Sequence, residues 1–212
     1  ILVGLVGSEM CIRDRSYRIA AAVAQIGNAS VNDQFGGGFR TELDSHANMC
    51  VLGKHCLLLS ELSTARTVRV GAFSDSAGGL NNVPIVDALI AYDCERTNQV
   101  YLLVLKNALY IEDMDDNLIP PFILRDAGLT VNDKAKIHCE EGTATEEDHT
   151  IQDKSNGTGL FITLQLRSIF SYFPSRKPNN DDLDDGVLVP ITPDGPTWDA
   201  YDQTYADNER SM

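Results

Sequence analysis

One carboxylate in this chain stands where a charged group is costly unless it has a chemical role. Asp44 lies within the segment ELDSHANMCVLG, and apolar residues close in on both sides of it. The next residue, Ser45, carries a small hydroxyl group that can donate or accept a hydrogen bond. Because burying a charge without a partner costs free energy, Asp44 is a candidate for acid–base chemistry.

Carboxylates that act on a peptide bond work in pairs. In aspartic proteases two of them lie about 3 Å apart and share one proton, so that one acts as base and the other as acid. This chain has a single Asp-Ser pair with apolar flanks, since Asp75-Ser76 and Asp153-Lys154-Ser155 lack them. A domain of roughly 100 residues with one such aspartate would have to pair with a second copy about a twofold axis. The alternative is structural, because Asp and Ser commonly cap a turn or the start of a helix.

A zinc site is the next interpretation to weigh. Ligand types that zinc prefers occur close together at His46, Cys50, His55 and Cys56. Positions 46 and 50 share a face only on a helix, however, and neighbours 55 and 56 point in opposite directions on a strand. We therefore expect both cysteines to be small buried hydrophobic residues, and we interpret the His138-Cys139 pair in the same way. No metal and no cofactor is expected.

Two clusters near the C-terminus have the chemistry of binding sites in an unsuitable setting. Rings and positive charges that could hold nucleic acid occur at Tyr172, Phe173, Arg176 and Lys177. Two basic residues in an acidic stretch are too few for that role. Carboxylates that could bind a divalent cation weakly follow at Asp181, Asp182, Asp184 and Asp185. A solvated acidic run is the simpler interpretation of these four.

The composition limits the classes of partner. The 212 residues carry a net charge of −14, and 43% of them are hydrophobic, which is enough for a core. Binding to phosphates needs clustered Lys and Arg, so we expect no direct contact with nucleic acid. The five cysteines are scattered without a CxxC pair, which favours reduced thiols in a cytoplasmic protein. The apolar segment 1–7 is too short to span a bilayer or to form a signal peptide, so we expect no membrane partner.

The chain divides into four segments by composition. Residues 1–38 are set aside, because VGSEMCIRDR resembles a translated sequencing adapter and the stretch up to residue 38 reads as a flexible linker. Segment 39–133 has the alternating pattern of a mostly β domain. Segment 134–173 predicts an additional β-hairpin that turns at Asn156-Gly157. Segment 174–212 is acidic and rich in Pro and Asn, so we expect a largely disordered tail or linker.

Within segment 39–133 the pattern predicts strands, one long turn and one helix. Pro120 and Pro121 are typical of a helix start, and Gly128 of its end. The stretch from Ser74 to Asn82 has a pure turn composition. Strands are expected at Arg40 to Leu43, Cys50 to Leu59, Thr67 to Phe73, Val83 to Tyr92, Val100 to Lys106, Ala108 to Ile111 and Leu129 to Val131. The Val100 and Ala108 strands could also be a single bent strand.

Four blocks, in order and well spaced, resemble the protease segment of copia-type retrotransposon polyproteins, in the divergent form of algae and related protists. They are ELDSHA from Glu42, VPIVDALIAYD from Val83, LVLKNALYIEDMDDNLIPPFILRDAGLTVND from Leu103 and FSYFPSRKP from Phe170. The resemblance implies a retropepsin-like fold, which is a small closed β-barrel-like protomer with one short helix. It also implies an aspartic endopeptidase that is active as a homodimer and cleaves its own polyprotein.

The resemblance also implies roles for the matching positions. Asp44 would be the catalytic aspartate, and Ser45 would hydrogen-bond across the dimer. The stretch from Ser74 to Asn82 would be the tip of a mobile flap that closes over the substrate. The stretch from Leu118 to Gly128 would form the helix behind the active strand. Substrate contacts would come from Ala47, Gly78 and Gly79.

The chain departs from the family's Asp-Ser/Thr-Gly triplet at the third position, where His46 stands. Glycine there permits a tight turn near the substrate, and a histidine with positive φ would cost about 1–2 kcal/mol. Two hypotheses follow from this residue. The domain is an active homodimeric endopeptidase, or it is a catalytically inactive module for dimerisation or scaffolding.

Overall fold

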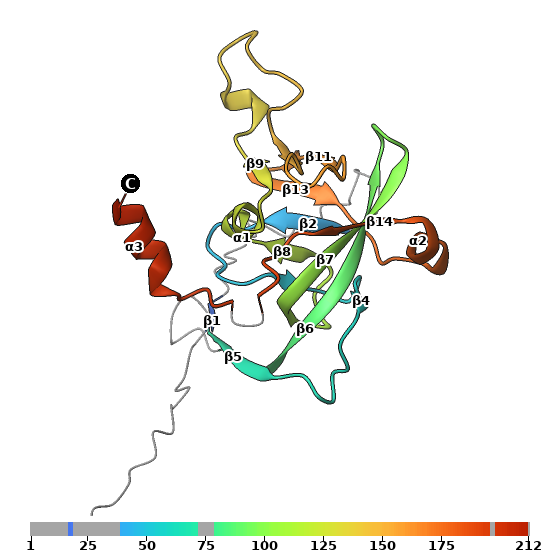
Figure 1. The fold of residues 1–212 in the computed structure, drawn as a ribbon, viewed down its shortest axis with the longest axis vertical. Coiled ribbons are helices and arrows are strands. Elements are labelled where there is room, and N and C mark those ends of the chain that lie inside the picture. The colour runs from blue at the N-terminus through green and yellow to red at the C-terminus, as the bar shows by residue number, and fades with distance from the viewer. Residues whose placement is uncertain (1–16, 19–38, 72–78, 196–197, 212) are drawn as a thin grey trace, which may run out of the picture.

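The computed structural model describes residues 17–18, 39–71, 79–195 and 198–211 (Figure 1). The fold of these residues is mostly β, as predicted, with a few short helices. Residues 1–16 and 19–38, which contain the adapter-like string and the expected linker, lie outside the described residues. Among the described residues, no helix is both long enough and apolar enough to cross a membrane.

Two sheets make up the β structure. The larger one has the strand order β1-β5-β6-β7-β3-β8-β2-β13-β12, with β14 beside β7 and β4 beside β6. Its strands are β1 (Tyr17–Arg18), β2 (Arg40–Leu43), β3 (Val51–Leu52), β4 (Leu57–Leu58), β5 (Thr67–Gly71), β6 (Gly79–Cys94), β7 (Gln99–Tyr110), β8 (Asn117–Ile119), β12 (Gln165–Arg167), β13 (Phe170–Pro174) and β14 (Val187–Pro190). The smaller one orders β11 (Phe161–Thr163), β10 (Thr150–Gln152) and β9 (Thr130–Asn132). Neither sheet closes on itself within the described ranges, so the closed barrel is not confirmed.

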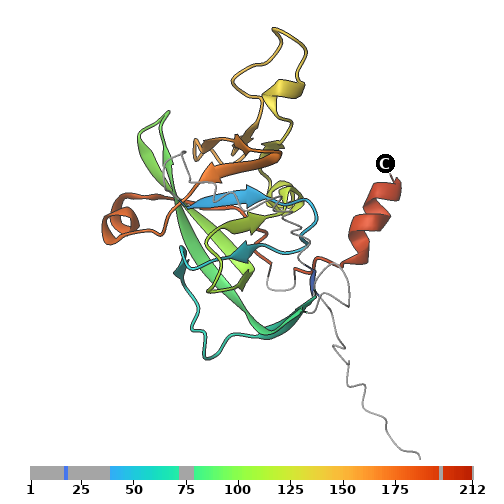
Figure 2. The ribbon, with the colours of Figure 1, turned by 180° about the vertical axis from the view of Figure 1, so that it is seen from behind.

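The helices are short and lie outside the sheets. Among the described residues they are α1 (Pro121–Asp126), α2 (Asn180–Asp185), α3 (Gln203–Ser211) and the 3-10 turn η2 (Lys136–His138). Figure 2 shows α2 and α3 at opposite ends of the molecule, with α1 between them beside β8. The expected helix start at Pro120 and Pro121 is confirmed. Gly128 follows the helix with a positive φ of 88°, a backbone conformation that glycine adopts without strain.

The long hairpin of β6 and β7 forms the centre of the larger sheet. Its pairing extends from Ile85 opposite Leu109 to Cys94 opposite Gln99. Of the two alternatives for residues 100–111, the single strand is confirmed as β7, and its irregularity lies at Asn107, where φ is +54°. The Asn107 amide donates to the Asp87 carboxylate at 3.0 Å, which occupies the donor that the broken ladder leaves free.

One core crosses the predicted segment boundaries. The buried residues include Ile90 and Leu103 of the central hairpin together with Ile151, Phe173 and Val189 from later in the chain. Strand β9 pairs with β10, and β2 with β13, across the boundary at 133. Strand β14 pairs with β7 across the boundary at 173. The division at 133 and 173 therefore does not separate packed units, because the later strands complete the same core.

The additional hairpin in segment 134–173 is present as β10 and β11, but its turn differs from the prediction. The strands end at Gln152 and resume at Phe161, so the connection is longer than an Asn-Gly turn. Gly157 has a positive φ, whereas Asn156 does not, and a type I′ turn needs both. The Asp153 carboxylate shapes this loop, because it accepts hydrogen bonds from the amides of residues 155 and 156 and from a hydroxyl.

The expectation of a largely disordered tail at 174–212 is wrong for residues 174–195. Strand β14 pairs in parallel with β7, and Val189 and Ile191 are fully buried. The acidic run is used locally: Asn179 and Asp182 form a reciprocal capping box at the start of α2. Composition averaged over the segment hid two features that order it, namely the apolar strand and the cap.

The same acidic run holds the chain to β6 through Arg176. Its guanidinium donates to both oxygens of Asp93 at 2.7 Å and to Asp182 at 2.5 and 2.8 Å. The Arg176 hydrogen bonds lower the pKa of Asp182, and the backbone hydrogen bonds from Asn179 add to that effect. Asp182 is 6% exposed, so its charge is compensated inside the fold.

We expect Asp182→Asn to lower the free energy of unfolding by about 1–2 kcal/mol at neutral pH, because it removes a charged hydrogen bond and weakens the helix cap. Urea denaturation measures the difference. The folded-state pKa of Asp182 lies below the unfolded value of 3.8, so the stabilisation that the ionised carboxylate gives to the fold is complete above that pH. It is lost as pH falls through the folded pKa, and the two proteins should converge there. Asp184→Asn, on the exposed side of α2, is the control; an equal loss in that variant would contradict the assignment.

Candidate active site

Asp44 lies directly after β2, in a loop that passes over the end of β8. Strand β8 runs between β2 and β3: it is parallel to β2, with Leu43 opposite Ile119, and antiparallel to β3, with Val51 opposite Leu118. The Asp44 amide donates to the Ile119 carbonyl at 3.1 Å. The aspartate is therefore attached to two strands that are far apart in sequence.

The two oxygens of the Asp44 carboxylate have different surroundings. Oδ1 accepts a hydrogen bond from the His46 amide at 2.9 Å. Oδ2 is buried and has no hydrogen-bond partner among the described residues, and the side chain as a whole is 13% exposed. An unpaired buried carboxylate oxygen is costly and uncommon in native proteins. The hydrogen-bonding capacity of this oxygen is thus unmet within the described part of the chain.

The three residues after Asp44 differ in their exposure. His46 does not have a positive φ, so the conformational cost expected for a histidine at this position does not arise. Its ring is exposed, and Nδ1 lies 3.9 Å from Oδ1 of Asp44 and 3.3 Å from the Ser45 hydroxyl. Ser45 is exposed, as a contact with a second copy would require. Ala47 is buried within the chain, and its proposed contact with substrate stays a prediction.

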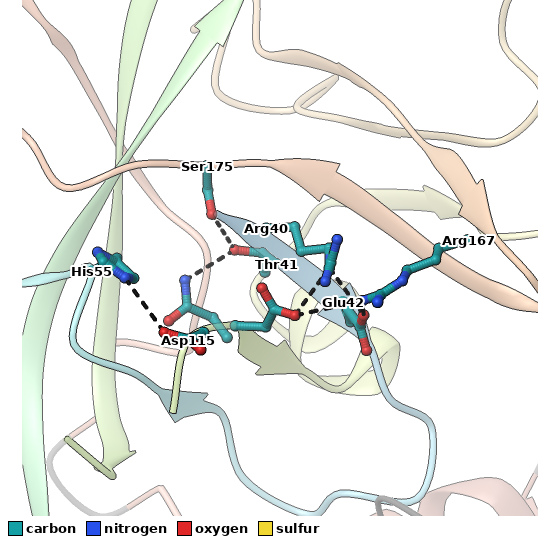
Figure 3. A network of polar contacts seen from close by, with 9 residues as sticks. Arg40, Thr41, Glu42, His55, Asp115, Arg167 and Ser175 are labelled. Atoms are coloured by element: carbon teal, nitrogen blue, oxygen red, sulfur yellow. Dashed lines mark hydrogen bonds and ion pairs between the residues drawn. The ribbon is translucent and has the colours of Figure 1, made fainter. Parts of the chain in front are cut away.

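A buried polar network lies behind the loop, and sequence patterns gave no sign of it. The Thr41 hydroxyl is 2.8 Å from the Ser175 hydroxyl and accepts from the Asn117 amide at 3.2 Å. The side-chain oxygen Oδ1 of Asn117 accepts from the Gly53 backbone amide at 3.0 Å. Figure 3 shows Thr41 and Ser175 pointing toward each other between β2 and β13. These bonds join the strands on either side of Asp44 to the C-terminal part of the chain.

A charged group covers the outer side of β2. The Arg40 guanidinium donates to Asp116 at 2.9 Å and lies 3.4 Å from Glu42, and Arg167 lies 4.0 Å from both carboxylates (Figure 3). Burial raises the pKa of Glu42 and the nearby Asp116 adds to this, whereas both guanidiniums oppose it. Because each carboxylate already has a cationic partner, this group positions β2 and is not an acid–base pair.

The zinc interpretation finds no support in the geometry. Among the described residues, no three His, Cys, Asp or Glu side chains gather as metal ligands would. Burial raises the pKa of the Cys50 thiol to about 12 and that of Cys56 to about 11. Both thiols are free and buried, as small hydrophobic residues would be. His55 faces Asp115 instead, at 3.9 Å (Figure 3).

The expected flap corresponds to the hairpin of β5 and β6. The two strands are paired up to Gly71 opposite Gly79, and the described residues of the expected tip, 79–82, belong to β6. Gly79 is exposed, whereas Gly78 and the rest of the tip lie outside the described residues. Figures 1 and 2 place this end of the hairpin on the same side of the molecule as the loop after β2.

A cavity of about 590 Å³ lies away from Asp44, at the turn between β6 and β7. It is lined by charged and polar residues, among them Arg96, Glu146 and Asp153. The Arg96 guanidinium stacks over the Phe161 ring, and it lies 3.9 Å from Glu146. The carboxylate of Asp153 is already bonded to its own loop, so it is not free to act as an acid or base in this cavity.

Comparisons of the chain with protein-family models, with curated proteins and with solved structures gave no match.

Proposed function

We propose that this chain is one half of an aspartic endopeptidase, in which two copies each contribute Asp44. The observation that carries the proposal is the pair of environments at this carboxylate. Oδ1 is held by the His46 amide, and Oδ2 is buried without a partner in the described part of the chain. A carboxyl group of a second copy, sharing one proton with Asp44, would satisfy Oδ2 and form the catalytic dyad.

The chemistry of such a dyad follows from the shared proton. The ionised carboxylate takes a proton from a water molecule held between the two groups, and that water attacks the peptide carbonyl. The protonated carboxyl donates to the carbonyl oxygen as the tetrahedral intermediate forms. The backbone hydrogen bond from Asp44 to Ile119 holds the main chain at this residue. It thereby restricts where the carboxylate can lie, and general acid–base catalysis requires such a fixed position.

The surrounding elements support a retropepsin-like protomer. A strand that leads to Asp44 runs beside β8, α1 follows β8 directly, and a long hairpin reaches the same side of the molecule. Ser45 would bond across the dimer, and the 74–82 tip would cover the substrate. Because four blocks of the sequence resemble copia-type retrotransposon polyproteins, the proposed substrate is the polyprotein to which this chain would belong.

An inactive dimerising module is the second candidate. The observation that favours it is the exposed His46 ring, which stands 3.9 Å from the Asp44 carboxylate where the family has glycine. In this case the two copies would still pair through the same face, and the pair would not hydrolyse peptides.

The test is cleavage of a proteome-derived peptide library by the purified chain, read by mass spectrometry between about pH 4 and 7. We expect Asp44→Asn to lower cleavage by about 10²–10⁴-fold, since one neutral amide replaces the acid–base group in each copy. Asp113→Asn, an exposed aspartate in the loop before β8, should cleave like the parent. Cleavage that persists in the Asp44 variant would reject the proposal. Dimers without cleavage in the parent would favour the inactive module.

A further inference from the structure

The C-terminal segment 198–211, called the strap below, lies on the side of the molecule that holds Asp44. Figures 1 and 2 show α3 of the strap beyond α1, on the same side as the loop after β2. The Asn48 side chain, from the loop that follows Asp44, donates to the Tyr201 hydroxyl at 2.7 Å. This contact joins the strap to the loop that carries the candidate catalytic residue.

The second set of strap contacts is made with α1. The Trp198 indole donates to Asp126 at 3.1 Å and to the Tyr205 hydroxyl at 2.9 Å, and Tyr205 donates to Asp126 at 2.8 Å. The Tyr205 ring meets the Phe122 ring edge to face, with centroids 5.2 Å apart. Trp198 also packs against buried hydrophobic residues of the core. Three aromatic residues of the strap therefore cover α1 and the Asp44 loop.

These contacts are suited to release. Helix α3 has nine residues and no buried side chain, and an isolated helix of that length is not stable in water. Phe122 is still 56% exposed and Tyr201 50% exposed while they make these contacts. The strap is thus held by a few partly exposed aromatic contacts, and little of its own surface is removed from solvent.

We propose that the strap occupies the surface that fits a second copy of this chain, so that it must detach before two copies bring their Asp44 carboxylates together. This inference rests on the proposed function. Because the loop after β2 and α1 lie on one side, a second copy that approaches Asp44 meets the strap first (Figure 2). Oδ2 of Asp44 has no hydrogen-bond partner among the described residues when the strap is bound, and the pairing of two chains would supply one.

The test uses the full chain with Tyr201→Ala and Tyr205→Ala together. Trp198 is the only tryptophan of the chain, so its fluorescence reports strap position independently of catalysis. We expect emission at longer wavelength in the double variant, and a dimer dissociation constant about tenfold lower by sedimentation. Asp207→Ala, whose carboxylate contacts Gln203 and Arg210 within α3, should match the parent in both measurements.

The outcomes separate this inference from the endopeptidase proposal. Association is measured in an Asp44→Asn background as well, so it does not depend on cleavage. Tighter association without cleavage by the parent supports the proposal that the strap blocks pairing, and it rejects the endopeptidase proposal. Unchanged association or unshifted emission in the double variant rejects the strap proposal. Tyr201→Phe removes only the hydroxyl bonded to Asn48 and leaves the ring in place. A smaller shift in the same direction excludes misfolding as the cause.

Discussion

An equal mixture of the parent chain and the Asp44→Asn chain should retain about a quarter of the cleavage activity of the parent at the same total concentration. Random pairing of two kinds of chain leaves about a quarter of the dimers with two aspartates. A dimer with one aspartate and one asparagine lacks the shared proton that the dyad needs. If each chain acted alone, about half of the activity would remain, because dilution of active sites would be the only effect.

The mixture must be measured well above the dimer dissociation constant, with time allowed for chains to exchange. The substrate is one peptide selected from the library for efficient cleavage. Mixing the parent with Asp113→Asn is the matched control, and it should keep full activity. A result near one half would contradict the shared site and would return Asp44 to a role within a single chain. The result thus tests the pairing that the unmet Oδ2 suggests.

Gly53→Ala should be among the most destabilising single substitutions in the described part of the chain, by about 2–4 kcal/mol. A Cβ at this position would lie 2.2 Å from the backbone oxygen of Met114 and 2.8 Å from its carbonyl carbon. A side chain could turn away from such a contact, whereas backbone atoms cannot. The segment must therefore move, and the Gly53 amide would lose its hydrogen bond to the buried Asn117 side chain.

The loss would extend toward Asp44. A displaced Gly53 leaves its own amide and the Asn117 side-chain oxygen without partners, and both groups are buried. Asn117 also donates to Thr41, three residues before the aspartate, so the disturbance reaches the strand that leads to Asp44. Urea denaturation measures the free energy of unfolding of the variant. Gly195→Ala is the control, since its Cβ would come no closer than 3.8 Å to other atoms. If both variants were as stable as the parent, the close approach of Gly53 to the Met114 backbone would be wrong.

Local patterns in the sequence predicted the elements that neighbouring residues determine. Two prolines start α1, because proline restricts φ to a value that a helix start accepts. A glycine follows its end, because glycine can adopt the positive φ needed there. Alternation of apolar residues predicted β5 and the central hairpin, since one face of each strand must be buried. The strand from Arg40 to Leu43, which ends directly before Asp44, was predicted as well.

Contacts between distant residues were beyond these patterns. The Thr41 and Ser175 hydroxyls are 134 positions apart in sequence, and nothing near either residue predicts their bond. The order of residues 174–195 depends on an edge of β7 that only the folded sheet provides. An acidic composition was a poor guide there, because Arg176 and a helix cap hold the buried carboxylate of Asp182.

The sequence by itself determined that an aspartate with a following hydroxyl residue would end a strand in a mostly β chain, because these properties depend on neighbouring residues. Only the tertiary structure decided what that aspartate lacks. The Ile119 carbonyl and the His46 amide hold one side of Asp44, and Oδ2 is left buried and unpaired among the described residues. Burial and hydrogen bonding depend on which strands meet, and the pairing of β2 with β8 joins residues more than seventy positions apart.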